Sequence, residues 1–359
     1  MFAEKHFPEI VLPSELDAYL SKGWYRMGQT LFTTHFLCFD EEFYSAIWIR
    51  LPLRDYRFRK SLRKLLRRNR REFEVRIRPA FINREKELLY QKYRGDFAGI
   101  LAPSLKQALL DGEDFSIFDT REVAVYHRGR LVAVSFFDLG KDSVASIMGI
   151  YDPELGKHSL GFYTMLEEID YARKKKLAHY YPGYVVPGYA RFDYKLRIGP
   201  VEYFDIGDGK WNPYDFLKPD EVPISLMNEK LDALAAYLSE KGIPVTKKYY
   251  PLFEANLFGF WQAPFFDFPV FLHCFPDRPG HDHLVAVFDP RSKRFNLGHC
   301  LPYEDVLFYF NEIHHHRFSR EDFFLQLLTV EETLICEDQL HRVGEELQNL
   351  YNSTSAGRP

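Results

Sequence analysis

The chain has 359 residues, more than a single hydrophobic core usually organises, so we expect at least two domains. Apolar residues make up 46% of it, including 33 Phe and 23 Tyr, which argues against disorder. No uncharged apolar stretch is long enough to cross a bilayer, and the first residues lack a secretory pattern, so we expect a cytoplasmic protein without membrane contact. The net charge of −4 argues against a polyanionic partner on average, but it hides a local cluster of the opposite sign.

Short strands and helices alternate through residues 1–95, which we take as an N-terminal domain. Ser14 can cap a helix through Lys22, and alternating runs predict strands at residues 25–36 and 46–53. A basic helix from about Arg59 to Arg71, the strand FEVRIRP and a helix from Asn83 to Arg94 follow.

Residues 96–212 carry the clearest pattern. Three strands, EVAVYH, LVAVSFFDLG and SVASIMGIYD, precede the amphipathic helix LGFYTMLEEIDYARKKK. The strand AHYYPGYVV, a polar helix or loop through Lys195 and a last strand near residues 201–204 complete the region. This order is similar to that of acyltransferases of the N-acetyltransferase (GNAT) type, as a fold-level analogy. We therefore predict an α+β fold with tandem N-acetyltransferase-like mixed sheets and flanking helices.

The composition changes beyond residue 212. Residues 213–351 predict an α+β extension of unknown role, with a helix at 225–241, a hairpin within HLVAVFDPRSKRFNLGH and helices from there to about Tyr351. Residues 352–359 predict a flexible tail.

A segment of high positive charge runs from Arg54 to Arg78. It holds twelve Lys or Arg against three acidic residues, a net charge of +9. On a helix, Leu62, Leu65 and Leu66 would pack inward while the cations fan outward, where they can lie along a phosphate backbone. A solvated charged face is the plainer interpretation, but the near absence of Asp and Glu favours a polyanionic partner. The candidate contacts are Arg59, Lys60, Arg63, Lys64, Arg67, Arg68, Arg70 and Arg71.

Ordered motifs fill residues 143–200. They are Tyr151-Asp152-Pro153, Ser159-Leu160-Gly161, Glu168-Ile169 with Ala172, the Tyr-Tyr-x-Gly-Tyr run from Tyr180 to Tyr184, and Tyr194-Lys195. In this order they resemble the catalytic region of arginyl-tRNA protein transferases and their bacterial relatives, the aspartate/glutamate leucyltransferases. The likeness extends weakly over roughly residues 10–205, because Arg67-Arg68-Asn69 followed by VRIRP also fits the family.

The resemblance implies an aminoacyltransferase. Such an enzyme moves an amino acid, here arginine first and leucine next, from charged tRNA to the N-terminal amine of proteins with acidic first residues, in arginylation and N-degron degradation. The reaction is aminolysis of an ester. The ordinary pKa of an α-amine is about 7.7 to 8.0, so a useful fraction is neutral and no strong base is required.

The resemblance also selects site residues. Tyr180, Tyr184 and Lys195 are the catalytic candidates, since tyrosines stack on unpaired bases and can donate to the ester. On a strand, Tyr180 and Tyr184 would share one face and Tyr181 would take the other. Asp152 and Glu168 could orient the amine. The candidates for substrate binding are Asp152, Ser159, Gly161, Gly183, Arg191, Tyr194 and Arg197.

Each of these has a plainer alternative. Ser159 can be an ordinary helix N-cap, Gly183 a bulge and Asp152 a turn former. Arg191 and Arg197 can form surface ion pairs, although a guanidinium also grips a carboxylate bidentately.

Cysteine usage departs from the family. Its members usually carry an N-terminal cysteine cluster that binds a metal or an iron–sulfur centre, where this chain has only Cys38. One thiol cannot complete a four-ligand site, so no metal or cofactor is expected. In the extension no standard metal spacing occurs among His281, His283, His299, His314–His316, Cys274 and Cys300.

Two other functions stay open at this point. An acyl-CoA-dependent N-acyltransferase would keep the fold but leave the +9 segment unexplained. A non-catalytic descendant that binds tRNA or protein would account for the missing cysteines.

Overall fold

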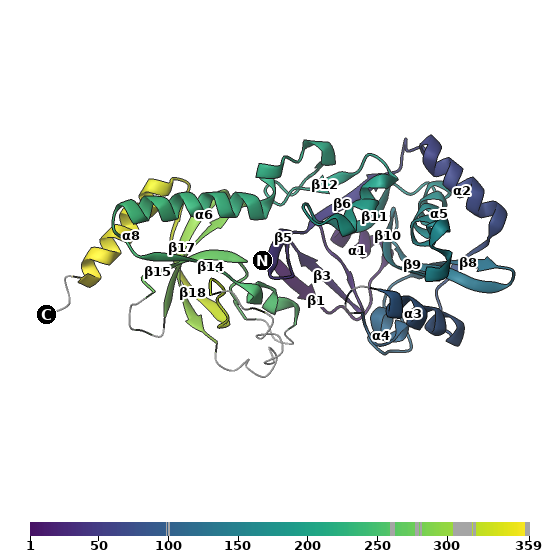
Figure 1. The fold of residues 1–359 in the computed structure, drawn as a ribbon, viewed down its shortest axis with the longest axis horizontal. Helices are drawn as coiled ribbons and strands as arrows, with labels where there is room; N and C mark the ends of the chain where they lie inside the picture. The colour runs from purple at the N-terminus through teal and green to yellow at the C-terminus, as the bar shows by residue number, and fades with distance from the viewer. Residues whose placement is uncertain are drawn as a thin grey trace.

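The computed structural model describes residues 1–97, 99, 101–258, 263–276, 280, 282–303, 318 and 321–355. Two units lie next to each other along the long axis (Figure 1). The larger unit contains an eight-stranded mixed sheet and the smaller a five-stranded antiparallel sheet. The chain is therefore an α+β protein with several sheets.

The eight-stranded sheet organises the larger unit. Its strands are β6 (Ile47–Pro52), β7 (Glu74–Pro79), β8 (Thr120–His127), β9 (Arg130–Leu139), β10 (Ser143–Tyr151), β11 (His179–Val185), β12 (Glu202–Phe204) and β13 (Trp211–Pro213). They lie in the order β13-β12-β6-β11-β10-β9-β8-β7. Strands β6 and β7 come from the first 95 residues, so one sheet joins both sides of the domain boundary expected there.

Helices cover both faces of this sheet. Helices α2 (Lys60–Glu72) and α5 (Leu160–Lys174) pack side by side on one face, and α3 (Arg84–Asp96) and α4 (Leu105–Leu110) pack on the other (Figure 1). Strand β8 shows the reason, because Val123 and Val125 join the first core while Ala124 and Tyr126 join the second. The basic helix predicted at residues 59–71 is confirmed as α2.

The N-terminal segment adds small elements that pack against both units. Helix α1 (Pro13–Leu20) packs with Trp48 and Tyr181. The small strands are β1 (Ala3–His6), β2 (Tyr25–Met27) and β3 (Thr30–Thr34), which form one sheet, and β4 (Phe36–Phe39) and β5 (Glu42–Ser45), which form a hairpin. Short 3-10 helices are η1 (Pro153–His158), η2 (Ala190–Ile198), η3 (Tyr214–Phe216), η4 (Pro219–Glu221) and η5 (Pro251–Leu257).

The smaller unit is built from the last third of the chain. Its strands, in sheet order, are β14 (Val245–Tyr249), β15 (Val270–Cys274), β16 (His283–Asp289), β17 (Arg294–Pro302) and β18 (Leu328–Glu337), with α6 (Pro223–Glu240) and α8 (Leu340–Ser355) beside them (Figure 1). Its core includes Phe2, and the amide of Phe2 donates to the buried carboxylate of Asp267. The N-terminus thus lies where the two units meet (Figure 1).

One expectation for the extension is wrong. Helices were expected from the hairpin to Tyr351, but residues 328–337 form β18, which pairs with β17. The segment LTVEETLICE is rich in β-branched residues, which suit a half-exposed strand. Among the described residues, no helix is long and apolar enough to cross a membrane.

Candidate active site

Among the described strands of the large sheet, β10 and β11 are the only neighbours that run parallel. They separate after three residue pairs. Ser143 to Ala145 pair with His179 to Tyr181. Beyond that point β10 continues along β9 and β11 continues along β6. The hydroxyl of Tyr25 lies where they part, 2.8 Å from the carbonyl oxygen of Tyr181 and in contact with that of Ser146. The sheet therefore opens between two strands that α5 connects.

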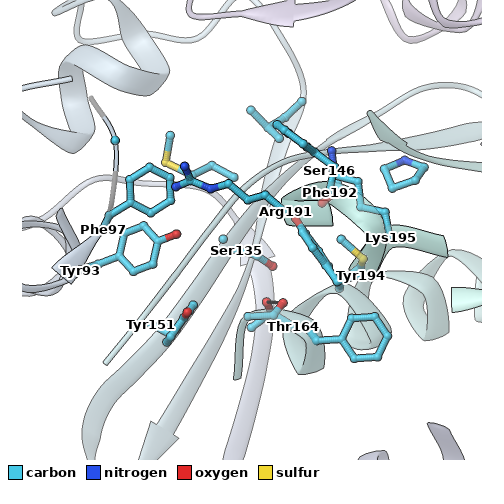
Figure 2. A pocket seen from close by; sticks show the side chains of 18 of the residues that line it. Tyr93, Phe97, Ser135, Ser146, Tyr151, Thr164, Arg191, Phe192, Tyr194 and Lys195 are labelled. Atoms are coloured by element: carbon cyan, nitrogen blue, oxygen red, sulfur yellow. Dashed lines mark hydrogen bonds between the residues drawn. The ribbon is translucent and has the colours of Figure 1, made fainter. Parts of the chain in front are cut away.

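A pocket of about 1310 Å³ occupies this opening. Tyr93, Phe97 and Tyr151 line one side of it, and Phe192, Tyr194 and Lys195 lie on the other (Figure 2). Seven residues that the sequence selected line this one pocket, namely Ser159, Gly161, Glu168, Tyr184, Arg191, Tyr194 and Lys195. The structure therefore brings together motifs that were recognised only by their order in the sequence.

Helix α5 begins at the edge of the pocket. Ser159 occupies the N-cap position with φ 51°, and its side chain makes no capping hydrogen bond. The first N–H groups of the helix therefore lack a side-chain acceptor from the cap, and they carry the positive end of the helix dipole. A Cβ on Gly161 would lie 3.0 Å from the ring of Tyr151, so the glycine lets this ring pack against the start of the helix.

The carboxyl group of Glu168 is buried in the wall of the pocket. Its side chain is 0% exposed, and its Oε2 accepts a hydrogen bond of 2.7 Å from the hydroxyl of Tyr180. Oε1 has no hydrogen-bond partner among the described residues. Burial raises the pKa of Glu168 to about 7, against a partial opposing effect of the Ser135, Tyr180 and Ser146 hydroxyls. Leaving a buried acceptor unsatisfied costs about 1–3 kcal/mol, so this carboxyl calls for an explanation.

Lys195 also lines the pocket and forms no ion pair among the described residues. Its Nζ donates to the carbonyl oxygen of Tyr184 at 2.8 Å and lies 5.1 Å from the ring centre of Phe192. Burial lowers the pKa of Lys195 to about 7. Gly183 has φ +90°, and a Cβ there would lie 3.3 Å from this Nζ, so glycine is needed for both conformation and space.

The expected alternation of tyrosines along β11 is wrong. A register shift lies between Tyr180 and Gly183. Tyr180 packs in the core on the α5 side, whereas Tyr181 and Tyr184 both pack in the cluster around Trp48. The extra residue of the bulge moves Tyr184 to the face of Tyr181, which places it in the pocket wall.

Arg191 reaches across the pocket from η2. Its guanidinium lies 4.3 Å from the ring centre of Phe97 (Figure 2). Within the part of the chain that the structure describes, it forms no ion pair, and its side chain is exposed. Tyr194, 40% exposed, lies beside it. Arg191 is thus available to an anion.

Several predicted site residues lie outside the lining of the pocket. The buried carboxylate of Asp152 pairs with Lys92 at 2.6 Å and Arg130 at 3.1 Å, which makes it an anchor of the turn. The guanidinium of Arg197 lies 4.8 Å from the ring centre of Phe162. Tyr180 is fully buried and approaches the pocket only through Glu168.

The predicted RNA contacts all lie on the surface of α2 or at its start. Seven of them form no ion pair among the described residues, namely Arg59, Lys60, Arg63, Lys64, Arg67, Arg68 and Arg71. Arg70 differs, because its guanidinium pairs with Glu167 and Asp170 of α5 at 2.6 Å. Arg68 donates to the carbonyl oxygen of Lys157 at 3.3 Å, so the end of α2 reaches the segment just before the pocket.

Some pocket residues have no signal in the sequence. Ser135 of β9, Tyr93 and Phe97 near the end of α3, and Cys38 to Asp40 of the β4–β5 hairpin all line it. They come from elements far apart in the chain. Tyr151 and Glu168 differ, because both stand within the quoted motifs and both line the pocket.

The four cysteines are divided between the two units. Cys38 lies on β4 beside the pocket, whereas Cys274, Cys300 and Cys336 lie on β15, β17 and β18 of the other unit. In the described ranges no group of three or more His, Cys, Asp or Glu residues could hold a metal ion. His281 and His314–His316 lie outside those ranges.

Comparisons with known proteins identify a family and relatives. The family model described as "Arginine-tRNA-protein transferase, C terminus" matches residues 82–205. An aspartate/glutamate leucyltransferase of Leptospira interrogans is 27% identical over 202 residues, 55% of this chain and 76% of that protein. One of Xanthomonas campestris is 31% identical over 169 residues, 45% of this chain and 67% of that protein.

Solved structures are only distantly similar. The structure of L-PGS from Bacillus licheniformis matches with a TM-score of 0.31 and 11% identity over 39% of this chain and 46% of that chain. The glucosamine N-acetyltransferase region of a fungal multi-domain β-N-acetylglucosaminidase matches with a TM-score of 0.28 and 13% identity over 53% of this chain and 21% of that chain. The family match covers α3, β9, β10, α5, β11 and η2, which supply most of the residues that line the pocket. Together with the identity to the Xanthomonas relative, it shows that the chain belongs to the aminoacyl-tRNA protein transferase family of aminoacyltransferases.

Proposed function

We propose that this protein transfers an amino acid from the 3′ end of a charged tRNA to the N-terminal amine of proteins that begin with Asp or Glu. The observation that carries the proposal is the contact between the basic helix and the pocket. Asn69 of α2 donates to the carbonyl oxygen of His158 at 2.9 Å, one residue before Ser159 in the pocket wall. RNA phosphates bound along α2 would therefore lead to the mouth of the pocket.

The pocket suits the loaded end of a tRNA. Its volume of about 1310 Å³ exceeds the 300–1,000 Å³ that is usual for small ligands, which leaves room for a nucleoside together with its amino acid. The aromatic rings of Tyr93 and Tyr151 can stack on the terminal adenine. The order β8, β9, β10, α5, β11 supports an N-acetyltransferase-like sheet, which is the finer fold that we propose for this unit.

Lys195 and the start of α5 supply donors for the reaction. When the acceptor amine attacks the ester carbonyl, negative charge develops on the carbonyl oxygen. An Nζ group fixed by the Tyr184 carbonyl, or an N–H of the first turn of α5, can stabilise that charge. Holding the amine and the ester in attack geometry contributes further, on the order of 7–11 kcal/mol in the best model reactions.

Arg191 is the group that we assign to the acceptor. An exposed guanidinium without an ion pair among the described residues can bind the carboxylate of a first Asp or Glu bidentately. The stacking of Arg191 on Phe97 holds the guanidinium at the pocket. Selection for acidic first residues would follow from this one contact.

For the donor we place leucine first. The relatives with the identities given above are named leucyltransferases, and Leu160, Phe162 and Met165 provide an apolar wall. Arginine, which the family resemblance places first, is our second candidate, because the family model carries it in its name. A guanidinium in the pocket would meet the carboxyl of Glu168.

A transfer assay tests the proposal. Purified protein is incubated with tRNA charged with labelled leucine or arginine and with peptides that begin with Asp, Glu, Gln or Ala, and the peptide N-termini are read by mass spectrometry. We expect leucine on the Asp and Glu peptides. Absence of transfer from a complete aminoacyl-tRNA pool would contradict the proposal. Acyl transfer from acyl-CoA, or salt-sensitive tRNA binding without turnover, would then identify which alternative holds.

A further inference from the structure

We propose that the carboxylate of Glu168 accepts the proton of the attacking α-amine and then delivers it to the ribose oxygen that leaves. This inference rests on the proposed function. It assigns an acid–base role to a side chain that sequence motifs alone associate only with orienting the amine.

The geometry singles out one oxygen of this carboxyl. Oε2 is occupied by the Tyr180 hydroxyl at 2.7 Å, while Oε1 is buried without a partner among the described residues. Glu168 is among the residues that line the pocket, so a ligand bound there can bring a donor to Oε1. An amine N–H is the donor that would complete it. Tyr180 is a positioning residue, because it fixes the carboxyl through the oxygen that does not react.

The groups that face Glu168 are neutral. They are the hydroxyls of Ser135 on β9, Ser146 on β10 and Tyr180 on β11, and further away those of Tyr25 and Tyr194. Within the described chain, no Lys or Arg pairs with it, unlike Glu167. With a pKa of about 7 the carboxylate can take a proton near neutral pH and give it back, as a general acid–base group must.

The step balances without any further reactant. The amine nitrogen forms a bond to the ester carbon, and its N–H, which becomes acidic as the nitrogen attacks, passes its proton to Oε1. The tetrahedral intermediate then breaks the bond between the carbon and the ribose oxygen. The proton moves from Glu168 to that oxygen, which leaves a peptide bond, a ribose hydroxyl and an ionised Glu168.

The test compares transfer rates of wild type and Glu168→Gln in single turnovers from about pH 5.5 to about pH 8.5. The ratio of the two rates cancels the titration of the acceptor amine. We expect the ratio of the wild-type rate to the Glu168→Gln rate to be small at low pH, where Glu168 is protonated. The ratio should rise through pH 7 to about 10²–10⁴. A ratio that does not change with pH, or equal rates, would overturn the inference.

Two further variants keep the test decisive. Glu254→Gln is the matched control, because burial also raises the pKa of Glu254 to about 7 but this side chain is not among those that line the pocket. The ratio of the wild-type rate to the Glu254→Gln rate should stay near one. Tyr180→Phe removes a hydrogen bond that lowers the pKa of Glu168, so its rate profile should move to higher pH. An unmoved midpoint would count against the role. If wild type itself transfers nothing, the proposed function fails instead.

Discussion

The two sides of helix α5 handle charge in opposite ways. Toward α2, the carboxylates of Glu167 and Asp170 both lie 2.6 Å from the guanidinium of Arg70. Toward the pocket, the very next residue, Glu168, meets hydroxyl groups, and Lys195 across the pocket rests on a carbonyl oxygen and aromatic rings. Consecutive glutamates on one helix thus have different partners.

We propose that this difference separates charges that stabilise the fold from charges that act in the reaction. A paired carboxylate stays ionised and joins two helices, whereas a buried group without a counter-ion shifts its pKa toward neutrality and costs stability. Such shifts gather at functional sites, because acids and bases there must exchange protons near the working pH. The pKa values of Glu168 and Lys195, both about 7, fit that interpretation.

Replacing Lys195 tests the pocket side through the transfer rate. Lys195→Met should lower single-turnover transfer about 10²–10³-fold, the usual result of removing one donor to a developing oxyanion. The stability of the protein should not fall, because a desolvated amine is exchanged for an apolar chain. Arg197→Met is the control on the same short helix, since Arg197 lies against Phe162 and is not among the residues that line the pocket. An equal loss in both variants would remove the distinction between them.

Stability as a function of pH tests the two glutamates directly. The folded pKa of Glu168, about 7, lies above its ordinary value of 4.5, so its contribution to stability is present below pH 4.5 and is lost as pH rises through 7. Glu168→Gln should therefore gain about 2–3 kcal/mol over wild type between pH 5 and pH 8, measured by urea unfolding. Glu167→Gln should instead lose stability at both pH values, because it weakens the pair with Arg70. The comparison fails if the two variants behave alike.

The parts of this arrangement that are local could be predicted from the sequence. The basic helix was expected at residues 59–71 and spans Lys60–Glu72, because its leucine spacing and cations are both local signals. The family motifs likewise named Ser159, Tyr184 and Lys195, which lie around one pocket.

The remaining features depend on partners that are distant in the chain. The bulge that turns Tyr184 into the pocket arises where β11 pairs with β6, and no local pattern announces it. Asp152, a site candidate in the sequence, forms ion pairs with Lys92 and Arg130. The unpartnered oxygen of Glu168 can be recognised only once Ser135 and Tyr180 surround it.

The α2 side is tested by its surface cations. Arg63, Arg67 and Arg71 are spaced four residues apart and share one helix face. Changing all three to Gln should weaken tRNA binding roughly 10–100-fold and reduce the slope of log affinity against log salt by about 2. Arg70→Gln on the same helix should mainly lower stability, because this guanidinium is engaged with Glu167 and Asp170. If Arg70→Gln alone reduced the salt slope as much as the triple variant, Arg70 would bind RNA despite its ion pairs with Glu167 and Asp170.

Replacing Arg191 should change the transfer rate least, but it should change the preference for acidic first residues directly. If its guanidinium binds the first carboxylate of the acceptor, Arg191→Gln should lower kcat/KM for Asp- and Glu-initiated peptides about tenfold. This is the lower end of the about 1.5–3 kcal/mol that hydrogen bonds to charged groups contribute, because Arg191 is exposed to solvent. Peptides that begin with Asn or Gln have the same shape without the charge, so their kcat/KM should hardly change. The ratio between the two classes therefore isolates the charge contact from any general damage to the pocket. A parallel loss for all four peptides would mean that Arg191 serves the tRNA or the fold, and that the acidic residue is recognised elsewhere.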